Sequence, residues 1–215
     1  MTSKSGAGGH PAAEVRQRLS PRVRALLLSG IILLATTTAG GLARLAADAL
    51  EVQTQWTTLT LAAALTVWAP GRFGLQWGDT TRHLPRLLLS LAGITLVVGT
   101  FRVLGGSVPW DGWEIWTSVP LAEDLLFHGA CLTALMWALT RGFSQETAAR
   151  TAVILSAFTF GVEHFGNSSI GTALVVIQVT NAILFGLLAG WLRLTTGSLV
   201  GPVLAHSTMN LVAVV

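Results

Sequence analysis

Residues 117–140 read TSVPLAEDLLFHGACLTALMWALT, and this stretch decides the class of fold. It is long and apolar enough to cross a bilayer as a helix, which takes about 20 residues. Similar apolar blocks lie near 24–43, 57–71, 84–104, 150–165, 170–192 and 197–214. Peptide groups in lipid must be hydrogen-bonded within the protein, so each block is predicted to be a helix. The sequence therefore predicts an all-α, polytopic transmembrane helix bundle of about seven spans, within a range of six to eight.

The composition of the whole chain agrees with a membrane protein. Of its 215 residues, 52% are hydrophobic and 11% are charged, whereas a soluble domain has about 25% charged residues. The lipid bilayer is therefore the first expected partner. The net charge of +3 is small and is concentrated near the N-terminus, so it does not indicate nucleic-acid binding. Cys131 is the only cysteine, which excludes an intrachain disulfide.

The chain divides into three predicted regions. Residues 1–22 are small, polar and basic and are predicted to form a disordered tail. Residues 23–110 are expected to form N-terminal transmembrane helices, and 111–215 a C-terminal transmembrane core. Arginines gather in the tail and in alternate loops, at positions 72, 82, 86, 141, 150 and 193. Basic loops stay cytoplasmic, so we predict a multi-pass cell-membrane protein with a cytoplasmic N-terminus and an external C-terminus.

Two groups of small or polar residues in the 170–192 block predict helix packing. Gly186 and Gly190 form a Gly-x-x-x-Gly pattern, which is typical of helices in close contact. Gln178 and Asn181 lie three residues apart on the same predicted helix, and we expect them to form hydrogen bonds between helices.

Ionisable residues within the apolar blocks are the features that require a functional explanation, because each costs about 2.5 kcal/mol or more at the centre of a bilayer. All of the clear cases lie in the second half of the chain. Block 117–140 carries Glu123, Asp124 and His128. Block 150–165 ends in Phe160-Gly-Val-Glu-His164, and the last block carries His206-Ser-Thr-Met-Asn210.

The spacing of these residues predicts one shared site. Asp124 and His128 are four residues apart and can pair across one helical turn, while Glu123 is rotated from Asp124 by about 100°. His206 and Asn210 also share one helix face. Under the predicted topology, the three motifs reach similar depths and can meet in the external half of the bundle.

Two chemical interpretations fit these residue types. In the first, Glu123 is the general base that takes a proton from water, a histidine positions that water, and Asn210 with a second imidazole stabilises the oxyanion. In the second, Glu123, His164 and His206 bind a divalent metal such as zinc, which keeps one position open for water. Both sets of residues are suited to the hydrolysis of a peptide bond.

The three motifs, in this order, resemble those of the CAAX-protease and bacteriocin-processing family, also called the Abi family, of intramembrane proteases. The family pattern is Glu-Glu-x-x-x-Arg, then Phe-x-x-x-His, then His-x-x-x-Asn. The matching segments here are Glu123 to His128, Phe160 to His164 and His206 to Asn210. The run Thr196-Gly-Ser-Leu is also similar to the family sequence, and the resemblance covers about 115–215.

The resemblance implies an intramembrane endopeptidase in which Glu123 activates water with the help of His164, while His206 and Asn210 stabilise the oxyanion. We favour a reaction without a cofactor, because an amide suits oxyanion binding better than metal ligation. Asp124, His128 and Phe160 are then supporting residues. The expected substrate is a membrane-associated, hydrophobic or lipidated peptide, and the predicted external site favours an exported peptide over a prenylated cytosolic one.

Two departures from the family pattern leave other functions open. Asp124 stands in place of the second Glu, and His128 stands in place of the Arg. Arginine stays charged at physiological pH, whereas histidine changes its charge near neutrality. The pair can preserve an acid–base contact, or it can mark a catalytically inactive membrane partner or a bacteriocin self-immunity protein. A small transporter with a proton relay through Glu123, His164 and His206 is a third hypothesis.

Overall fold

The computed structural model describes residues 19–50, 82–103 and 117–214. These residues form helices joined by turns, which confirms the all-α prediction. The elements are α1 (Pro21–Leu50), α3 (Leu84–Val103), α4 (Ser118–Asp124), the π-helix η2 (Leu125–Cys131), α5 (Leu132–Leu139), α6 (Gln145–Glu163), the 3-10 helix η3 (His164–Ile170), α7 (Thr172–Thr196) and α8 (Val200–Val214).

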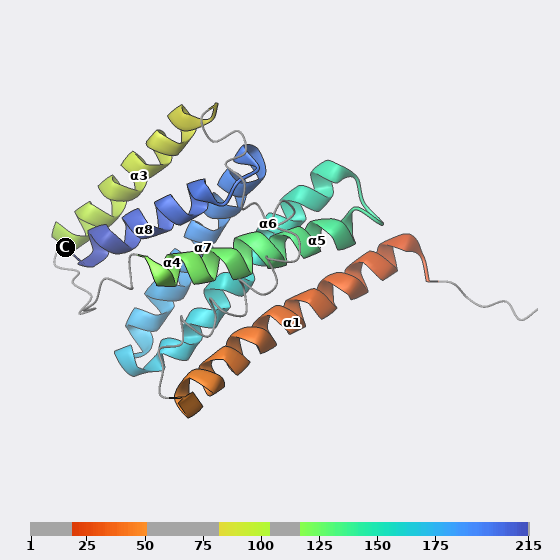
Figure 1. Cartoon of the computed structure of the whole chain (residues 1–215), viewed down its shortest axis with the longest axis horizontal. Coiled ribbons are helices and arrows are strands. Elements are labelled where there is room, and N and C mark those ends of the chain that lie inside the picture. The colour runs from red at the N-terminus through yellow and green to blue at the C-terminus, as the bar shows by residue number, and fades with distance from the viewer. Residues whose placement is uncertain (1–18, 51–81, 104–116, 215) are drawn as a thin grey trace, which may run out of the picture.

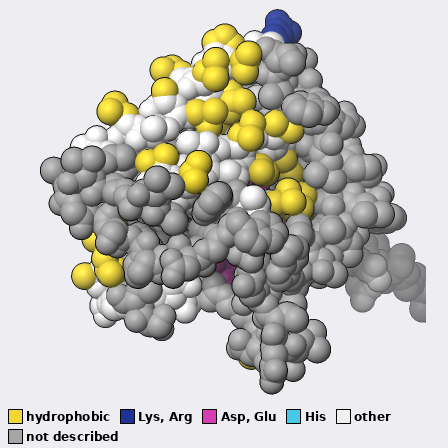
Figure 2. Space-filling model, turned by 60° about the vertical axis from the view of Figure 1, so that its left-hand side comes forward, with side chains coloured by type: hydrophobic (Ala, Val, Ile, Leu, Met, Phe, Trp, Pro, Cys, Tyr) yellow, Lys and Arg dark blue, Asp and Glu magenta, His cyan; other side chains and the backbone are white. Residues whose placement is uncertain are grey.

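The described part contains three segments long and apolar enough to cross a membrane: Pro21–Leu42, Ser118–Leu139 and Thr172–Thr196. Hydrophobic side chains gather on the described part of the face drawn in Figure 2. In α1 and α3, Leu34, Leu89 and Leu96 are 68%, 74% and 71% exposed, as expected for side chains that face lipid. The prediction of a polytopic membrane bundle is confirmed. The total of about seven spans stays a prediction, because the block 57–71 lies outside the described residues.

A central rod organises the bundle. The elements α4, η2 and α5 follow one another without a break, and α6 and α7 pack beside them (Figure 1). At one edge α1 lies against α5 and α6, and at the opposite edge α3 lies against α8. The second half of the chain therefore forms the centre of the bundle, and the two described N-terminal helices flank it.

One end of the bundle is rich in arginine. A Cβ atom built on Gly142, in the turn between α5 and α6, would lie 2.8 Å from the Cα of Arg22, so the start of α1 packs on this turn. The same turn contains Arg141, and Arg193 lies in the last turn of α7. Because α7 runs back toward this end, the turn from α7 to α8 also lies here (Figure 1). The predicted cytoplasmic loops that contain Arg141 and Arg193 thus lie at one end of the described bundle, together with the start of α1.

Glycines allow α6 and α7 to approach closely. A Cβ atom on Gly186 would lie 2.8 Å from the Cα of Ala157, and one on Gly190 would lie 3.0 Å from a methyl group of Val153. The packing role predicted for this glycine pair is confirmed. The amides predicted to bond between elements also do so: Gln178 accepts from Asn167 of η3 at 3.1 Å, and the Asn181 amide contacts the Met209 sulfur at 3.6 Å.

Only part of the predicted division into three regions falls within the described residues. The predicted tail, 1–22, lies outside them except for its last four residues, of which Pro21 and Arg22 already belong to α1. The boundary near residue 110 also lies outside the described part. The division into N-terminal helices and a C-terminal core therefore stays a prediction.

The glycine contacts predict a measurable difference in stability. We expect Gly186→Ala to destabilise the protein by about 1–3 kcal/mol, because the added methyl group meets the backbone of α6 and the two helices must separate. Gly30→Ala is the matched control, since nothing lies within 4 Å of a Cβ atom there. Thermal unfolding in detergent measures both. Equal stability of wild type and Gly186→Ala would contradict the packing described above.

Candidate active site

The central rod changes its winding at the ionisable residues. Glu123 and Asp124 end α4, and His128 lies within the π-helix η2. The N–H of Leu132 bonds to the carbonyl of Phe127, five residues earlier, which widens the helix at this point. Such widened turns are frequent at functional sites. The spacing argument from the sequence assumed a regular α-helix and missed this feature, because the local sequence carries no signal for it.

Two carboxylates and two imidazoles form one continuous set of contacts. Oδ1 of Asp124 lies 3.5 Å from Nε2 of His128, and Oδ2 lies 3.5 Å from Nδ1 of His206. The other nitrogen of His206, Nε2, lies 3.6 Å from Oε2 of Glu123. The predicted pairing of Asp124 with His128 is therefore confirmed. Both carboxylates also reach His206, so the rod and α8 are joined by carboxylate–imidazole contacts.

Exposure separates the two carboxylates. The side chains of Asp124 and His128 have no exposed surface, and that of His206 is 3% exposed. The Glu123 side chain is 27% exposed, so its carboxylate remains accessible. Within this set, Glu123 is the member that can meet water or a substrate, while Asp124 is enclosed by protein.

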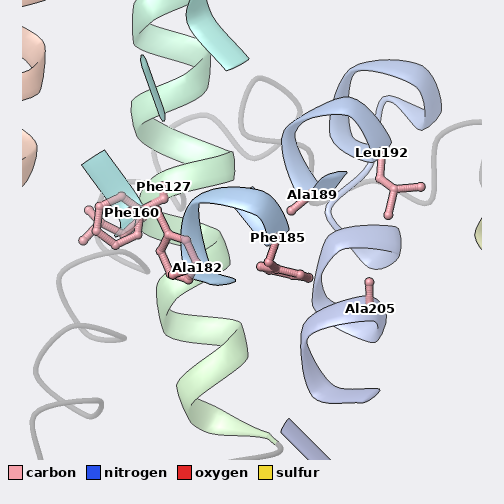
Figure 3. Close-up of a cluster of buried hydrophobic side chains, with 8 residues drawn as sticks. Phe127, Phe160, Ala182, Phe185, Ala189, Leu192 and Ala205 are labelled. Atoms are coloured by element: carbon pink, nitrogen blue, oxygen red, sulfur yellow. The ribbon is translucent and has the colours of Figure 1, made fainter. Parts of the chain in front are cut away.

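Aromatic rings surround the imidazoles. The ring centroid of Phe160 lies 5.7 Å from that of His128, 4.9 Å from His164 and 5.7 Å from His206. Phe185 of α7 lies 4.6 Å from His206. Figure 3 shows Phe160 and Phe185 within a cluster of buried apolar side chains from η2, α6, α7 and α8. The rings limit the orientations of the imidazoles and keep bulk water away from Asp124.

The predicted supporting role of Phe160 gains a physical basis from these contacts, because one ring touches all three histidines. Phe185 was missed in the sequence. It lies within a long apolar block, where nothing distinguishes a phenylalanine beside a histidine from one that faces lipid.

His164 is oriented by its own helix end. It follows α6, and its Nδ1 lies 2.9 Å from the carbonyl oxygen of Phe160. A carbonyl can only accept, so Nδ1 carries the proton in this contact and the neutral ring keeps its free lone pair on Nε2. The side chain is half-buried. His164 joins the other residues through the shared ring of Phe160.

Asn210 lies one turn beyond His206 on α8 and is half-buried. The structure thus brings Glu123, Asp124, His128, Phe160 and His206 into direct contact. His164 adjoins them through Phe160, and the helix fixes Asn210 beside His206.

The metal alternative requires at least three convergent ligands. Among the described residues, no group of three or more His, Cys, Asp or Glu side chains has the arrangement of a metal site. Both nitrogens of His206 face carboxylates, and Nδ1 of His164 faces a carbonyl oxygen. Metal binding by Glu123, His164 and His206 therefore stays a prediction.

Comparison with known proteins gives one match. The family described as "Type II CAAX prenyl endopeptidase Rce1-like" matches residues 105–212, about half of the chain. No curated protein and no solved structure matches this chain. The matched region includes all of the motif residues, from Glu123 to Asn210. The chain therefore belongs to the Rce1-like family of type II CAAX prenyl endopeptidases.

Proposed function

We propose that this protein is an intramembrane endopeptidase that hydrolyses a peptide bond in a membrane-associated, hydrophobic or lipidated peptide. The observation that carries the proposal is the contact of His206 with both Glu123 and Asp124, within an apolar helix bundle of a protease family. Ionisable groups held together at this depth are costly and therefore favour a functional role.

Glu123 is the general base in this mechanism. Its carboxylate is the exposed member of the set and can contact a water molecule. It accepts a proton from that water as the oxygen attacks the carbonyl carbon of the substrate. When the tetrahedral intermediate collapses, the carbon–nitrogen bond breaks and Glu123 returns the proton to the leaving amine.

His164 orients the attacking water. The hydrogen bond from Nδ1 to the Phe160 carbonyl keeps the acceptor lone pair on Nε2. Nε2 can accept a hydrogen bond from water while Glu123 removes the other proton. Phe160 fixes the plane of the ring through its edge contact.

His206 and Asn210 supply the oxyanion donors. Asp124 holds Nδ1 of His206 in place on one side of the ring. On the other side, the Nε2–H faces Glu123 and can donate its hydrogen bond to the oxyanion instead when substrate binds. The Asn210 amide, one helical turn further along, is the second donor. One such donor is worth about 10²–10³ in rate. Asp124 acts through His206 and is a positioning residue.

The metal-free form of this mechanism stays a proposal. The amide of Asn210 supports it, because an amide serves oxyanion binding better than ligation of a metal ion. Activity is then expected to survive a strong chelator, and loss that is restored by added zinc would favour a metalloprotease.

A catalytically inactive partner or self-immunity protein is the alternative. The observation that favours it is the replacement of the family's Glu and Arg by Asp124 and His128. In the structure these residues still pair at 3.5 Å, which supports a working site.

The site is proposed to open toward the outside of the cell membrane. The arginine-rich end of the bundle is assigned to the cytoplasm by the positive-inside rule. His164 follows the last residue of α6 at the opposite end of the bundle. Helix α4 also begins at that end, shortly before Glu123. An exported or membrane-anchored peptide is therefore the favoured substrate over a prenylated cytosolic protein.

The central role of Glu123 is tested by comparing new protein termini in membranes that contain wild type or Glu123→Gln. We expect cleavage products with wild type, and a rate of cleavage lower by about 10²–10⁴ in the variant, because the amide cannot accept the proton from water. Glu146→Gln, at an exposed surface carboxylate, is the control that keeps activity. Identical product profiles for wild type and Glu123→Gln, with both proteins folded, would instead favour the inactive partner.

The pairing of Asp124 with His128 is tested by His128→Arg and His128→Leu. We expect His128→Arg to keep activity within about tenfold of wild type, because the guanidinium preserves a donor to Asp124. His128→Leu leaves that carboxylate with one contact fewer and is expected to lose most of the activity. The rate of peptide cleavage measures both. Abolished activity in a folded His128→Arg protein would contradict the pairing account.

Orientation is tested with a reporter fused after Val215. The reporter is an enzyme that is active only outside the cytoplasm. We expect this fusion to be active, because α8 runs away from the arginine-rich end. A matched fusion before the start of α1 should report the cytoplasm. A cytoplasmic signal from Val215 would contradict the proposed outward-facing site.

A further inference from the structure

We propose that Ser156 of α6 is a positioning residue that holds η2 in its π-helical form, and so sets the positions of Asp124 and His128 relative to His206. Ser156 is fully buried. Its hydroxyl donates a 2.7 Å hydrogen bond to the backbone carbonyl of Phe127, which joins α6 to η2. The catalytic consequence rests on the function proposed above, whereas the effect on η2 does not.

The accepting carbonyl takes part in the π-helical hydrogen bonding at the C-terminal end of η2. In a regular α-helix the Phe127 carbonyl would accept from the N–H four residues later, but here it accepts from Leu132, five residues later. A carbonyl oxygen has two lone pairs, and Leu132 and Ser156 together supply both donors. Ser156 therefore contacts η2 at a carbonyl that accepts one of its five-residue hydrogen bonds.

Other hydroxyls in the described bundle take a different partner. Thr159 of α6 bonds to the Leu155 carbonyl of its own helix, four residues earlier, and Ser29 bonds to Ala25 in the same way. This local bond is the usual solution for a hydroxyl inside a helix. Ser156 could bond to its own helix in the same way, yet its hydroxyl crosses to the neighbouring element.

Loss of this bond would reach the site through the winding of the rod. A change from a π turn to an α turn removes one residue from the turn, and one residue corresponds to about 100° of rotation. The side of the rod that carries Glu123 and Asp124 would then turn relative to α5, which α1 and α6 hold in place. The 3.5 Å contacts of Asp124 with both imidazoles depend on this alignment.

The experiment compares Ser156→Thr with Ser156→Val, two variants of nearly equal volume that differ by the hydroxyl. Ser156→Ala removes the hydroxyl without adding volume, and Thr159→Val removes a buried hydroxyl that bonds within its own helix. Hydrogen exchange of the backbone amides of η2, measured in detergent, reports on the winding of this segment.

We expect Ser156→Ala and Ser156→Val to lower kcat by about tenfold or more with little change in KM, and to speed hydrogen exchange of the η2 amides. Ser156→Thr should recover both values relative to Ser156→Val, and Thr159→Val should resemble wild type. Equal kcat and equal amide exchange in η2 across the Ser156 variants would overturn the proposal, as would a rise in KM alone. If wild type cleaves no peptide, the proposed function fails, while faster exchange of the η2 amides in Ser156→Val than in Ser156→Thr still supports the role of Ser156 in η2.

Discussion

The site depends on one constraint, which is that a carboxylate without exposed surface must be matched by donors or by opposite charge. Asp124 faces two imidazoles at 3.5 Å, one from its own rod and one from α8, and neither of its oxygens has a closer hydrogen-bond partner among the described residues. The second contact joins parts of the chain about 80 residues apart in sequence, since His206 lies on α8. The close approach of α8 to the rod is therefore a condition for burying Asp124 at all.

Packing of apolar and small residues makes this arrangement possible. The glycine-lined contact between α6 and α7 brings Phe160 and Phe185 together, with their ring centroids 6.2 Å apart. These rings exclude water from the imidazoles, and in a dry environment each remaining charged contact is stronger. Glu123 is the exception, with 27% of its side chain exposed. One site thus combines an enclosed carboxylate that orients a histidine with an accessible carboxylate suited to chemistry.

Membership of the Rce1-like family gives the motifs a shared context, and the structure gives the departures a physical meaning. Where the family pattern has a Glu–Arg pair, this chain has an Asp–His pair with no exposed surface. Both side chains are shorter than their counterparts, and the aromatic rings of Phe160 and Phe185 pack against the imidazole. The replacement is thus a pair of smaller groups in an enclosed, aromatic environment, with the same spacing of four residues.

The sequence by itself determined the helical membrane class, the packing face of Gly186 and Gly190, and the pairing of Asp124 with His128. These are local properties, because apolar length and a spacing of three or four residues act within a single helix. The contact of His206 with two carboxylates was foreseen only as a meeting of motifs at similar depth. Tertiary structure decided which atoms face each other, the choice of Phe185 as a neighbour of His206, and the π-helical winding at Phe127. The physical reason is that a carbonyl which accepts from both Leu132 and Ser156 needs a second helix at a fixed distance, and no local pattern specifies that distance.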